Sequence, residues 1–252
     1  MSSQEQFLKA LTEQGEPRFT ETWFPYTSGQ VGPYYIESLA ITRNGAAYHA
    51  AIDALCALIQ QTADINSIDA ISGGESRDWD FSNPVAYALG KPHVKIYKDK
   101  TTRGAEPTGR IIHVADLNNE GSSMRDLWHP TITAAGGTIV AAYFFVDRRE
   151  EGIEVMQQLS IPSHSVVPMN EQAWQYLERI GYISATLCQS LQERINDRRA
   201  WAHRALRQHP EQLIEMLQDI KKAARAQKIL NIGYPKIKDE LIALMQQRGY
   251  NS

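Results

Sequence analysis

Between residues 67 and 167, short runs rich in β-branched and other apolar residues alternate with segments of helical periodicity. Alternation of this kind favours a parallel sheet with helices on both faces, because a parallel strand pair needs a crossover and both faces of such a sheet must be buried. We therefore predict an α/β domain with a mostly parallel sheet flanked by helices. Its strands are expected at residues 67–72, 94–97, 110–115, 138–146 and 165–167.

The segments before and between these strands carry helix signals. Apolar residues recur at helical spacing in residues 44–61, where Asn44 is a plausible start signal. Pro84 is expected to open the next helix, since proline is well tolerated at the first helical position. A loop that enters a strand is expected at residues 27–36. Further helices are expected at residues 3–15, 123–135 and 150–159.

The β signal disappears after about residue 170, and the rest of the chain has helical patterns with breaks near Pro210 and Gly233. We expect an α/β domain over residues 1–170, with an N-terminal helix and a hood segment, and a helical C-terminal extension over residues 171–252. Basic residues gather in this extension with acids interleaved among them, which favours a solvated helical face over a partner or nucleic-acid surface. These basic residues are Arg198, Arg199, Arg204, Arg207, Lys221, Lys222, Arg225 and Lys228.

The overall charge favours a function that involves small molecules. The formal net charge is −3, with 26 basic and 29 acidic residues, so it gives no reason to expect nucleic acid or a membrane surface as a partner. Cys56 and Cys188 lie in apolar helical patterns without metal-ligand spacing, and we expect both to be reduced core residues. No stretch approaches the ~18 apolar residues of a membrane span, and the first residues lack a leader pattern. A cytoplasmic location is expected.

The sequence from 114 to 124 (VADLNNEGSSM) combines a strand end, a small polar loop and a helix start. In this geometry main-chain N–H groups and the helix dipole converge on one point and can hold a phosphate. Gly121 allows a tight path, Ser122 and Ser123 can donate to phosphate oxygens, and Asp116 would face the ligand crevice at the strand end. The alternative is an ordinary turn in which Ser122 only caps the helix.

Five separated segments resemble motifs of the orotate phosphoribosyltransferase family, in the order in which that family has them. The resemblance covers roughly residues 18–169. In the family these motifs are an N-terminal substrate segment, the pyrophosphate-binding turn, the mobile catalytic loop, the phosphoribosyl pyrophosphate motif and the segment whose arginine holds the orotate carboxylate. The matching segments are residues 27–35 (TSGQVGPYY), 71–77 (ISGGESR) with 84–86 (PVA), 97–104 (YKDKTTRG), 112–116 (IHVAD) with the loop after it, and 145–152 (FVDRREEG).

The resemblance implies a type I phosphoribosyltransferase-like fold and a Mg²⁺-dependent transfer of ribose 5-phosphate from phosphoribosyl pyrophosphate to a base such as orotate. It also implies a homodimer, since a lid of one subunit commonly closes over its neighbour's site in this family. Asp116 would contact the ribose and the metal, and the lid cations would be Lys98, Lys100 and Arg103. The implied substrate contacts are Tyr34, Tyr35 and Arg148 for the base, Gly73, Gly74 and Arg77 for the pyrophosphate, and Asn119, Gly121, Ser122 and Ser123 for the 5′-phosphate.

Several positions depart from the family's motifs. Ala115 stands where the family has the first of two acids, Glu120 adds a negative charge to the phosphate loop, and Val31 replaces a lysine that reaches substrate. A second hypothesis therefore stays open: a catalytically weakened protein of this fold that binds nucleotide or phosphoribosyl pyrophosphate in a regulatory or assembly role. A third is an unrelated doubly wound domain with a coincidental loop. Pyrophosphate release, repeated with Ala115→Asp, tests whether the site is a damaged form of the family's own.

Overall fold

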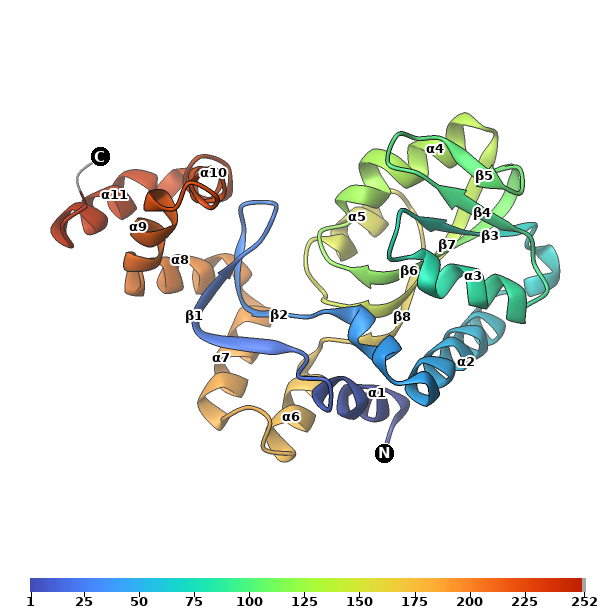
Figure 1. The fold of residues 1–252 in the computed structure, drawn as a ribbon, viewed down its shortest axis with the longest axis horizontal. Coiled ribbons are helices and arrows are strands. Elements are labelled where there is room, and N and C mark those ends of the chain that lie inside the picture. Colours follow the sequence, from blue (N-terminus) through green and yellow to red (C-terminus); the bar gives the residue numbers. More distant parts are fainter. Residues whose placement is uncertain (251–252) are drawn as a thin grey trace. The chain divides into compact units, whose positions relative to one another are not determined.

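The computed structural model describes residues 1–250, which form two compact units (Figure 1). The first unit comprises Met1–Gly15 and Glu37–Tyr176, and the second comprises Glu16–Ile36 and residues 177–250. The expected division at residue 170 placed residues 16–36 with the sheet, whereas the structure groups them with the C-terminal helices. Division of the chain into two functional domains stays a prediction.

The first unit is built on a six-stranded sheet with the strand order β5-β4-β3-β6-β7-β8. All neighbouring strands are parallel except β4 and β5, which pair antiparallel at the edge. The predicted mostly parallel sheet is therefore confirmed, although β5 was not predicted. The strands are β3 (Ala70–Gly74), β4 (His93–Ile96), β5 (Thr102–Gly104), β6 (Gly109–Asn118), β7 (Gly137–Asp147) and β8 (Ser163–Pro168).

Helices cover both faces of this sheet (Figure 1). On one face lie α1 (Ser3–Thr12), α2 (Gly45–Thr62) and α3 (Trp79–Ala88), and a short 3-10 helix, η1 (Ser38–Arg43), leads into α2. As predicted, Asn44 starts α2, because its side chain accepts hydrogen bonds from the main-chain N–H groups of Ala46 and Ala47. On the other face a π-helical turn, η3 (Met124–Trp128), continues into α4 (His129–Ala134), and α5 (Gly152–Gln158) follows β7. The unit ends within α6 (Glu171–Arg179).

Helix α3 begins before the proline that was expected to open it. It starts at Trp79, so Pro84 lies inside the helix and cannot donate to the carbonyl of Asp80, four residues earlier. That carbonyl instead accepts a hydrogen bond from the hydroxyl of Tyr48 in α2. A side chain from a neighbouring helix thus replaces the missing helical bond, which a sequence pattern does not reveal.

The second unit packs a β-hairpin against helices. Strands β1 (Arg18–Pro25) and β2 (Val31–Tyr35) pair antiparallel, and Trp23 and Val31 enter an apolar cluster formed mainly by the C-terminal helices. This shared core explains why the hairpin groups with the tail. The helices are α7 (Ala185–Asn196), α8 (Arg198–Gln208), α9 (Glu211–Gln218), α10 (Ala223–Lys228), the π-helical turn η4 (Ile229–Gly233), the 3-10 helix η5 (Pro235–Ile237) and α11 (Lys238–Gln247).

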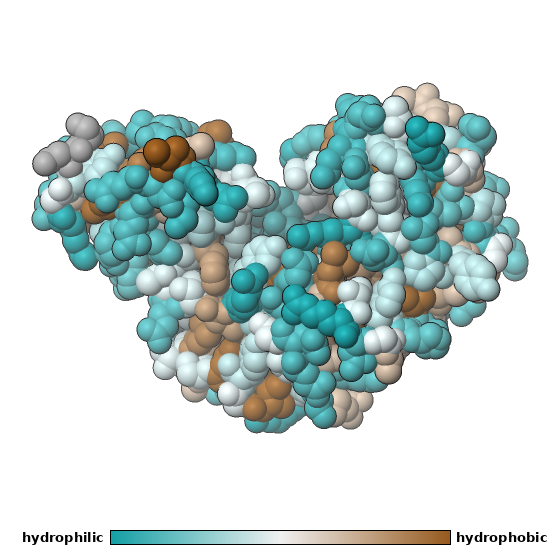
Figure 2. Space-filling view, in the orientation of Figure 1, coloured by the Kyte–Doolittle hydropathy of each residue, from teal (hydrophilic) through white to brown (hydrophobic). Residues whose placement is uncertain are grey.

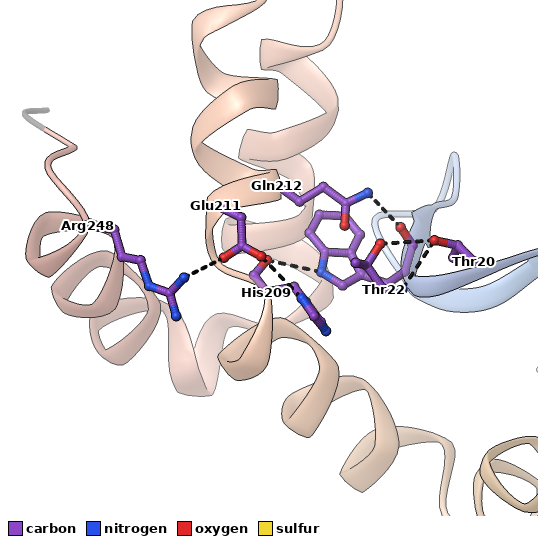
Figure 3. A network of polar contacts seen from close by, with 7 residues as sticks. Thr20, Thr22, His209, Glu211, Gln212 and Arg248 are labelled. Carbon is purple, nitrogen blue, oxygen red and sulfur yellow. Dashed lines mark hydrogen bonds and ion pairs between the residues drawn. The ribbon is translucent and has the colours of Figure 1, made fainter. Parts of the chain in front are cut away.

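A network of polar contacts joins the hairpin to the helices of this unit (Figure 3). The side chain of Gln212 donates to the main-chain oxygen of Trp23 at 2.9 Å, and the Trp23 indole N–H donates to the main-chain oxygen of His209 at 3.4 Å. On the other side of the network Nη1 of Arg248 lies 3.1 Å from Oε2 of Glu211. These contacts satisfy polar groups at the edge of the apolar cluster.

Apolar residues on the surface are scattered. On the face shown in Figure 2, hydrophobic side chains occur in small groups among hydrophilic ones, as on ordinary protein surfaces. No helix within residues 1–250 has both the length and the apolar character that crossing a membrane requires. Cys56 and Cys188 are buried and free, as expected, and burial followed by the charge of Asp53 raises the pKa of Cys56 to about 11.

Candidate functional site

The carboxyl ends of β3 and β6 meet at one edge of the sheet, because the two strands are parallel neighbours. The turn between β3 and α3 and the loop after β6 therefore lie at the same edge. This arrangement brings the predicted pyrophosphate turn, with Arg77, to the same edge as Asp116 and the predicted phosphate loop. In open α/β sheets ligands bind at the carboxyl ends of the strands.

Asp116 is buried at this edge and held from two sides. It is 5% exposed, and its Oδ2 accepts a hydrogen bond from the Ser38 hydroxyl at 2.5 Å. Its carboxyl also hydrogen-bonds to the carboxyl of Asp78. Burial, followed by the charge of Asp78, raises the pKa of Asp116 to about 7. Two acids that are buried side by side cannot both ionise easily, so Asp116 and Asp78 titrate as a coupled pair with raised pKa values.

Asp78, which the sequence analysis missed, is the second acid at this edge. Its Oδ2 accepts from the main-chain N–H of Gly74 at 3.0 Å, and its Oδ1 accepts from that of Asp116 at 3.4 Å. Burial raises the pKa of Asp78 to about 6, and the side chain of Asp116 and these N–H groups oppose the rise because they stabilise the charged form. The one signal in the sequence was its position, directly after Arg77 in the predicted turn.

Gly73 and Gly74 are required by packing. A Cβ on Gly73 would collide with the side chain of Ser82 in α3, and a Cβ on Gly74 would collide with the indole of Trp128 in η3. Both glycines thus let helices approach β3 closely from opposite faces of the sheet. Their expected contact with pyrophosphate stays a prediction.

Arg77 has an acidic neighbour. Its Nη1 lies 3.1 Å from Oε1 of Glu37, and its side chain is 47% exposed. A pyrophosphate would have to compete with this carboxylate for the guanidinium. The role expected for Arg77 stays a prediction.

The loop after β6 folds back onto α5. Gly121 has a φ of +68°, and a Cβ there would lie 2.8 Å from Cβ of Val155. The main-chain oxygen of Asn119 accepts from the N–H of Gly152 at 2.8 Å. Ser122 and Ser123 are exposed at the start of the following helix, so their hydroxyls are accessible to a ligand.

Two acceptor oxygens are buried in this loop. Neither Oδ1 of Asn119 nor Oε1 of Glu120 has a hydrogen-bond partner among the described residues. Such oxygens attract donors and cations and repel the oxygens of a phosphate. The charge of Glu120 therefore disfavours binding of an anion to this loop, whereas the glycine and serines of the loop favour it.

The segment that resembles a mobile catalytic loop is a tight hairpin between β4 and β5. Thr101 donates through its main-chain N–H, at 2.9 Å, and through its hydroxyl, at 2.7 Å, to Oδ1 of Asp99, and the N–H of Lys100 donates to the main-chain oxygen of Tyr97 at 2.9 Å. This Asp side-chain turn closes the loop within five residues, which the sequence analysis did not recognise. Lys98, Lys100 and Arg103 are exposed on this hairpin, and their contact with pyrophosphate stays a prediction.

Arg148 follows β7 and is buried. Its Nη2 lies 3.7 Å from Oε1 of Glu150, and its main-chain N–H donates to the oxygen of Asn118 at 2.9 Å. The backbone of Arg148 therefore adjoins the phosphate loop, and its expected contact with a base stays a prediction. Binding of a base carboxylate would need the guanidinium to be shared with Glu150.

Tyr34 and Tyr35 belong to the second unit. Tyr34 is buried, packs against the ring of Phe19 with a centroid separation of 5.9 Å, and has a main-chain oxygen that accepts from the Tyr26 hydroxyl. Arg18 stacks over the ring of Tyr35 at 4.9 Å. Whether either tyrosine reaches a base stays a prediction.

The acids at the edge of the sheet bear on magnesium binding. Within residues 1–250, no three His, Cys, Asp or Glu residues gather as a set of metal ligands. Magnesium in phosphate-transfer sites commonly uses one or two carboxylates together with substrate phosphates, so a complete protein cage is not required. Asp116, with Asp78 beside it, fits that smaller requirement.

Comparison with known proteins confirms the resemblance to orotate phosphoribosyltransferases. No family model matches the sequence. The orotate phosphoribosyltransferase of Rhizobium meliloti (strain 1021) is 27% identical over 154 residues, which cover 56% of this chain and 66% of that protein. The chain thus spans just under two thirds of the length of the curated relatives that it matches.

Solved structures show the same fold. An orotate phosphoribosyltransferase from Aeropyrum pernix superposes with a TM-score of 0.60 at 23% identity, covering 69% of this chain and 99% of that one. The orotate phosphoribosyltransferase of Francisella tularensis gives a TM-score of 0.62 at 16% identity, covering 75% of this chain and 96% of that one. The predicted fold, that of a type I phosphoribosyltransferase, is therefore confirmed.

Proposed function

We propose that this chain, which has the type I phosphoribosyltransferase fold and relatives among the orotate phosphoribosyltransferases, transfers ribose 5-phosphate from phosphoribosyl pyrophosphate to a nucleobase, with orotate as the acceptor. The observation that carries the proposal is the sheet edge at which Asp116, the turn containing Arg77 and the loop containing Gly121 meet. A ligand with a sugar between two phosphate groups needs these three elements together. The proposal includes a place in pyrimidine nucleotide biosynthesis.

The reaction is a displacement at the anomeric carbon of the ribose. A nitrogen lone pair of the base forms the new C–N bond while the C–O bond to pyrophosphate breaks. The bonding electrons leave with the pyrophosphate, and the proton on that nitrogen is lost to solvent. Asp116 would orient the ribose hydroxyls, and Gly121, Ser122 and Ser123 would hold the 5′-phosphate. Arg77, together with the exposed cations of the β4–β5 hairpin, would stabilise the charge on the leaving pyrophosphate.

Mg²⁺ bound to pyrophosphate oxygens would neutralise part of the leaving charge. Asp116 is the residue proposed to hold it. At the base, Arg148 would pair with the orotate carboxylate, and Tyr34 and Tyr35 would contact the ring. The proposal also includes a cytoplasmic homodimer, which light scattering of the purified chain would check through a mass of twice 28.4 kDa.

A second candidate is binding of the same ligands with little turnover. It is favoured by the pairing of Arg77 with Glu37, by the buried Glu120 oxygen and by the loss of an acid at Ala115. Removal of a single preorganised charge from a transition-state site can cost on the order of 10² to 10³ in rate. A protein with several such losses would bind phosphoribosyl pyrophosphate or nucleotide and release pyrophosphate slowly.

Release of pyrophosphate from phosphoribosyl pyrophosphate with Mg²⁺ separates the candidates when measured over a panel of bases. The transferase proposal expects base-dependent release, highest with orotate and lowered about 10²-fold in Asp116→Asn. Thermal unfolding with the same ligands supplies the second readout, because a ligand at 100 times its Kd adds about 2.7 kcal/mol. Stabilisation without pyrophosphate release selects the second candidate. If the ligands cause neither stabilisation nor release, both candidates are overturned.

A further inference from the structure

The position at which the phosphoribosyl motif lacks an acid does not face Asp116. Ala115 is 4% exposed and belongs to an apolar cluster with Met124 and Trp128 from the opposite face of the sheet. Successive side chains of a strand point to opposite faces, so Ala115 lies away from the side on which Ser38 contacts Asp116. A carboxylate at position 115 would be buried among apolar side chains.

A second carboxyl nevertheless lies beside Asp116, and it comes from the neighbouring strand's turn. Asp78 hydrogen-bonds to the Asp116 carboxyl and also accepts from the main-chain N–H groups of Gly74 and Asp116. It therefore contacts both the end of β3 and the end of β6. A single side chain links the turn proposed for pyrophosphate to the acid proposed for ribose.

A buried histidine lies beside Asp78. His113 is 0% exposed, its Nδ1 lies 3.0 Å from the Ser72 hydroxyl, and its Nε2 lies 3.7 Å from Oδ2 of Asp78. Within residues 1–250 this Nε2 has no hydrogen-bond partner. Burial lowers the pKa of His113 to about 3, so the ring is neutral. The charge of Arg77 lowers the pKa of Asp116, whereas burial, followed by the charge of Asp116, raises the pKa of Asp80.

We propose that Asp78 is a positioning residue of this site: its carboxylate ties Asp116 to the turn after β3 and takes the place of the second acid that position 115 cannot hold. The inference rests on the proposed function, because only a ligand that spans ribose and pyrophosphate needs a fixed spacing between Asp116 and this turn. Groups that bind two parts of one reactant act best when their separation is fixed in advance.

Amide hydrogen exchange tests, without any ligand, whether Asp78 holds the ends of β3 and β6 together. The main-chain N–H groups of Gly74 and Asp116 both donate to Asp78, so Asp78→Ala is expected to speed exchange at both amides at least 10-fold. Asp78→Asn keeps the size but only one acceptor oxygen, so it is expected to protect one of the two amides and to speed exchange at the other. Asp80→Asn, two residues along in α3, is the matched control because its carboxylate acts on Asp116 only through space. Unchanged exchange in Asp78→Ala overturns the inference.

Steady-state kinetics test the consequence of the tie. With phosphoribosyl pyrophosphate and Mg²⁺, Asp78→Ala is expected to raise KM and to lower kcat/KM by about 10- to 100-fold. Asp78→Asn, which keeps one of the two contacts, should recover part of this loss, and Asp80→Asn should stay within 2-fold of the wild type. If Asp78→Ala does not fold, Asp78→Ser replaces it in both experiments, since a single, shorter hydroxyl cannot bridge the N–H groups of Gly74 and Asp116 as the two carboxylate oxygens do.

The failures of the two proposals differ. If the wild type is active and kcat/KM is unchanged in Asp78→Ala (or Asp78→Ser) as it is in Asp80→Asn, the proposed function stands and the inference is overturned. A wild type that neither binds phosphoribosyl pyrophosphate nor releases pyrophosphate overturns the proposed function and, with it, the positioning role. Amide exchange then decides only whether Asp78 ties the two strand ends together.

Discussion

The guanidinium of Arg77 and the carboxylate of Glu37 form an ion pair of 3.1 Å at the edge of the sheet. Glu37→Gln is therefore expected to free Arg77 and to tighten pyrophosphate binding by up to about 5-fold, the range of a partly exposed ion pair of 0.2–1 kcal/mol. Calorimetric titration with pyrophosphate measures it. Arg77→Gln serves as the opposite control and should weaken binding; equal affinity in all three proteins would remove Arg77 from the proposed site.

Restoring the acid of the family's motif is expected to damage the protein. Ala115→Asp places a carboxyl in the cluster with Met124 and Trp128, at a cost of about 1–3 kcal/mol, and more at high pH where the group must ionise. Urea unfolding at pH 5 and pH 8 measures the loss, and Ala115→Asn controls for polarity without charge. A stable variant with faster pyrophosphate release would show instead that position 115 faces the ligand.

Tyr48 and Pro84 are expected to be energetically coupled through the Asp80 carbonyl. Tyr48→Phe removes the donor that replaces the missing Pro84 N–H and should cost about 0.5–1.5 kcal/mol. In a Pro84→Ala background the alanine N–H can bond to the same carbonyl, so the same change should cost less. A double-mutant cycle by chemical unfolding measures the difference. Equal costs in both backgrounds would mean that the tyrosine hydroxyl does not serve this carbonyl.

The histidine on β4 is expected to weaken the fold in acid. Burial, followed by the charges of Lys95 and His113, lowers the pKa of His93 to about 4. The unfolded chain takes up this proton near pH 6.5 and the folded chain does not, so stability is complete above about pH 6.5 and falls as the pH drops towards 4. His93→Gln should reduce the slope of the free energy of unfolding against pH in this window by at most about 1.4 kcal/mol per pH unit, as measured by chemical unfolding. Identical pH profiles would contradict the shift.

The sequence predicted the sheet because hydrophobic runs and helix signals are local. Asn44 marked the start of α2, and the segments that became β3, β4, β6, β7 and β8 were recognised within a few residues. Strand β1 was missed, because its apolar residues meet helices far along the chain rather than another strand of the main sheet. The start of α3 was misplaced because the compensating donor, Tyr48, lies 36 residues before Pro84.

The site was predictable where motifs are contiguous and not where contacts are distant. Asp116 and the loop with Gly121 stand together in the sequence, and the structure places them at the expected strand end. The pairing of Asp116 with Asp78, 38 residues away, depends on which strands become neighbours and has no local signal. The β4–β5 hairpin was missed because the segment was compared with a mobile loop, and the ability of the Asp99 side chain to close a turn was not considered.

Conversion of orotate to its ribose 5-phosphate nucleotide is the most direct measurement of the central proposal. Purified protein is incubated with orotate, phosphoribosyl pyrophosphate and Mg²⁺, and the nucleotide is separated by chromatography, with Asp116→Asn in parallel. We predict nucleotide formation in step with pyrophosphate release, and a loss of about 10²-fold in the variant. Absence of nucleotide from orotate and from every other base, in protein that is stabilised by phosphoribosyl pyrophosphate, would contradict the transferase and leave a binding protein.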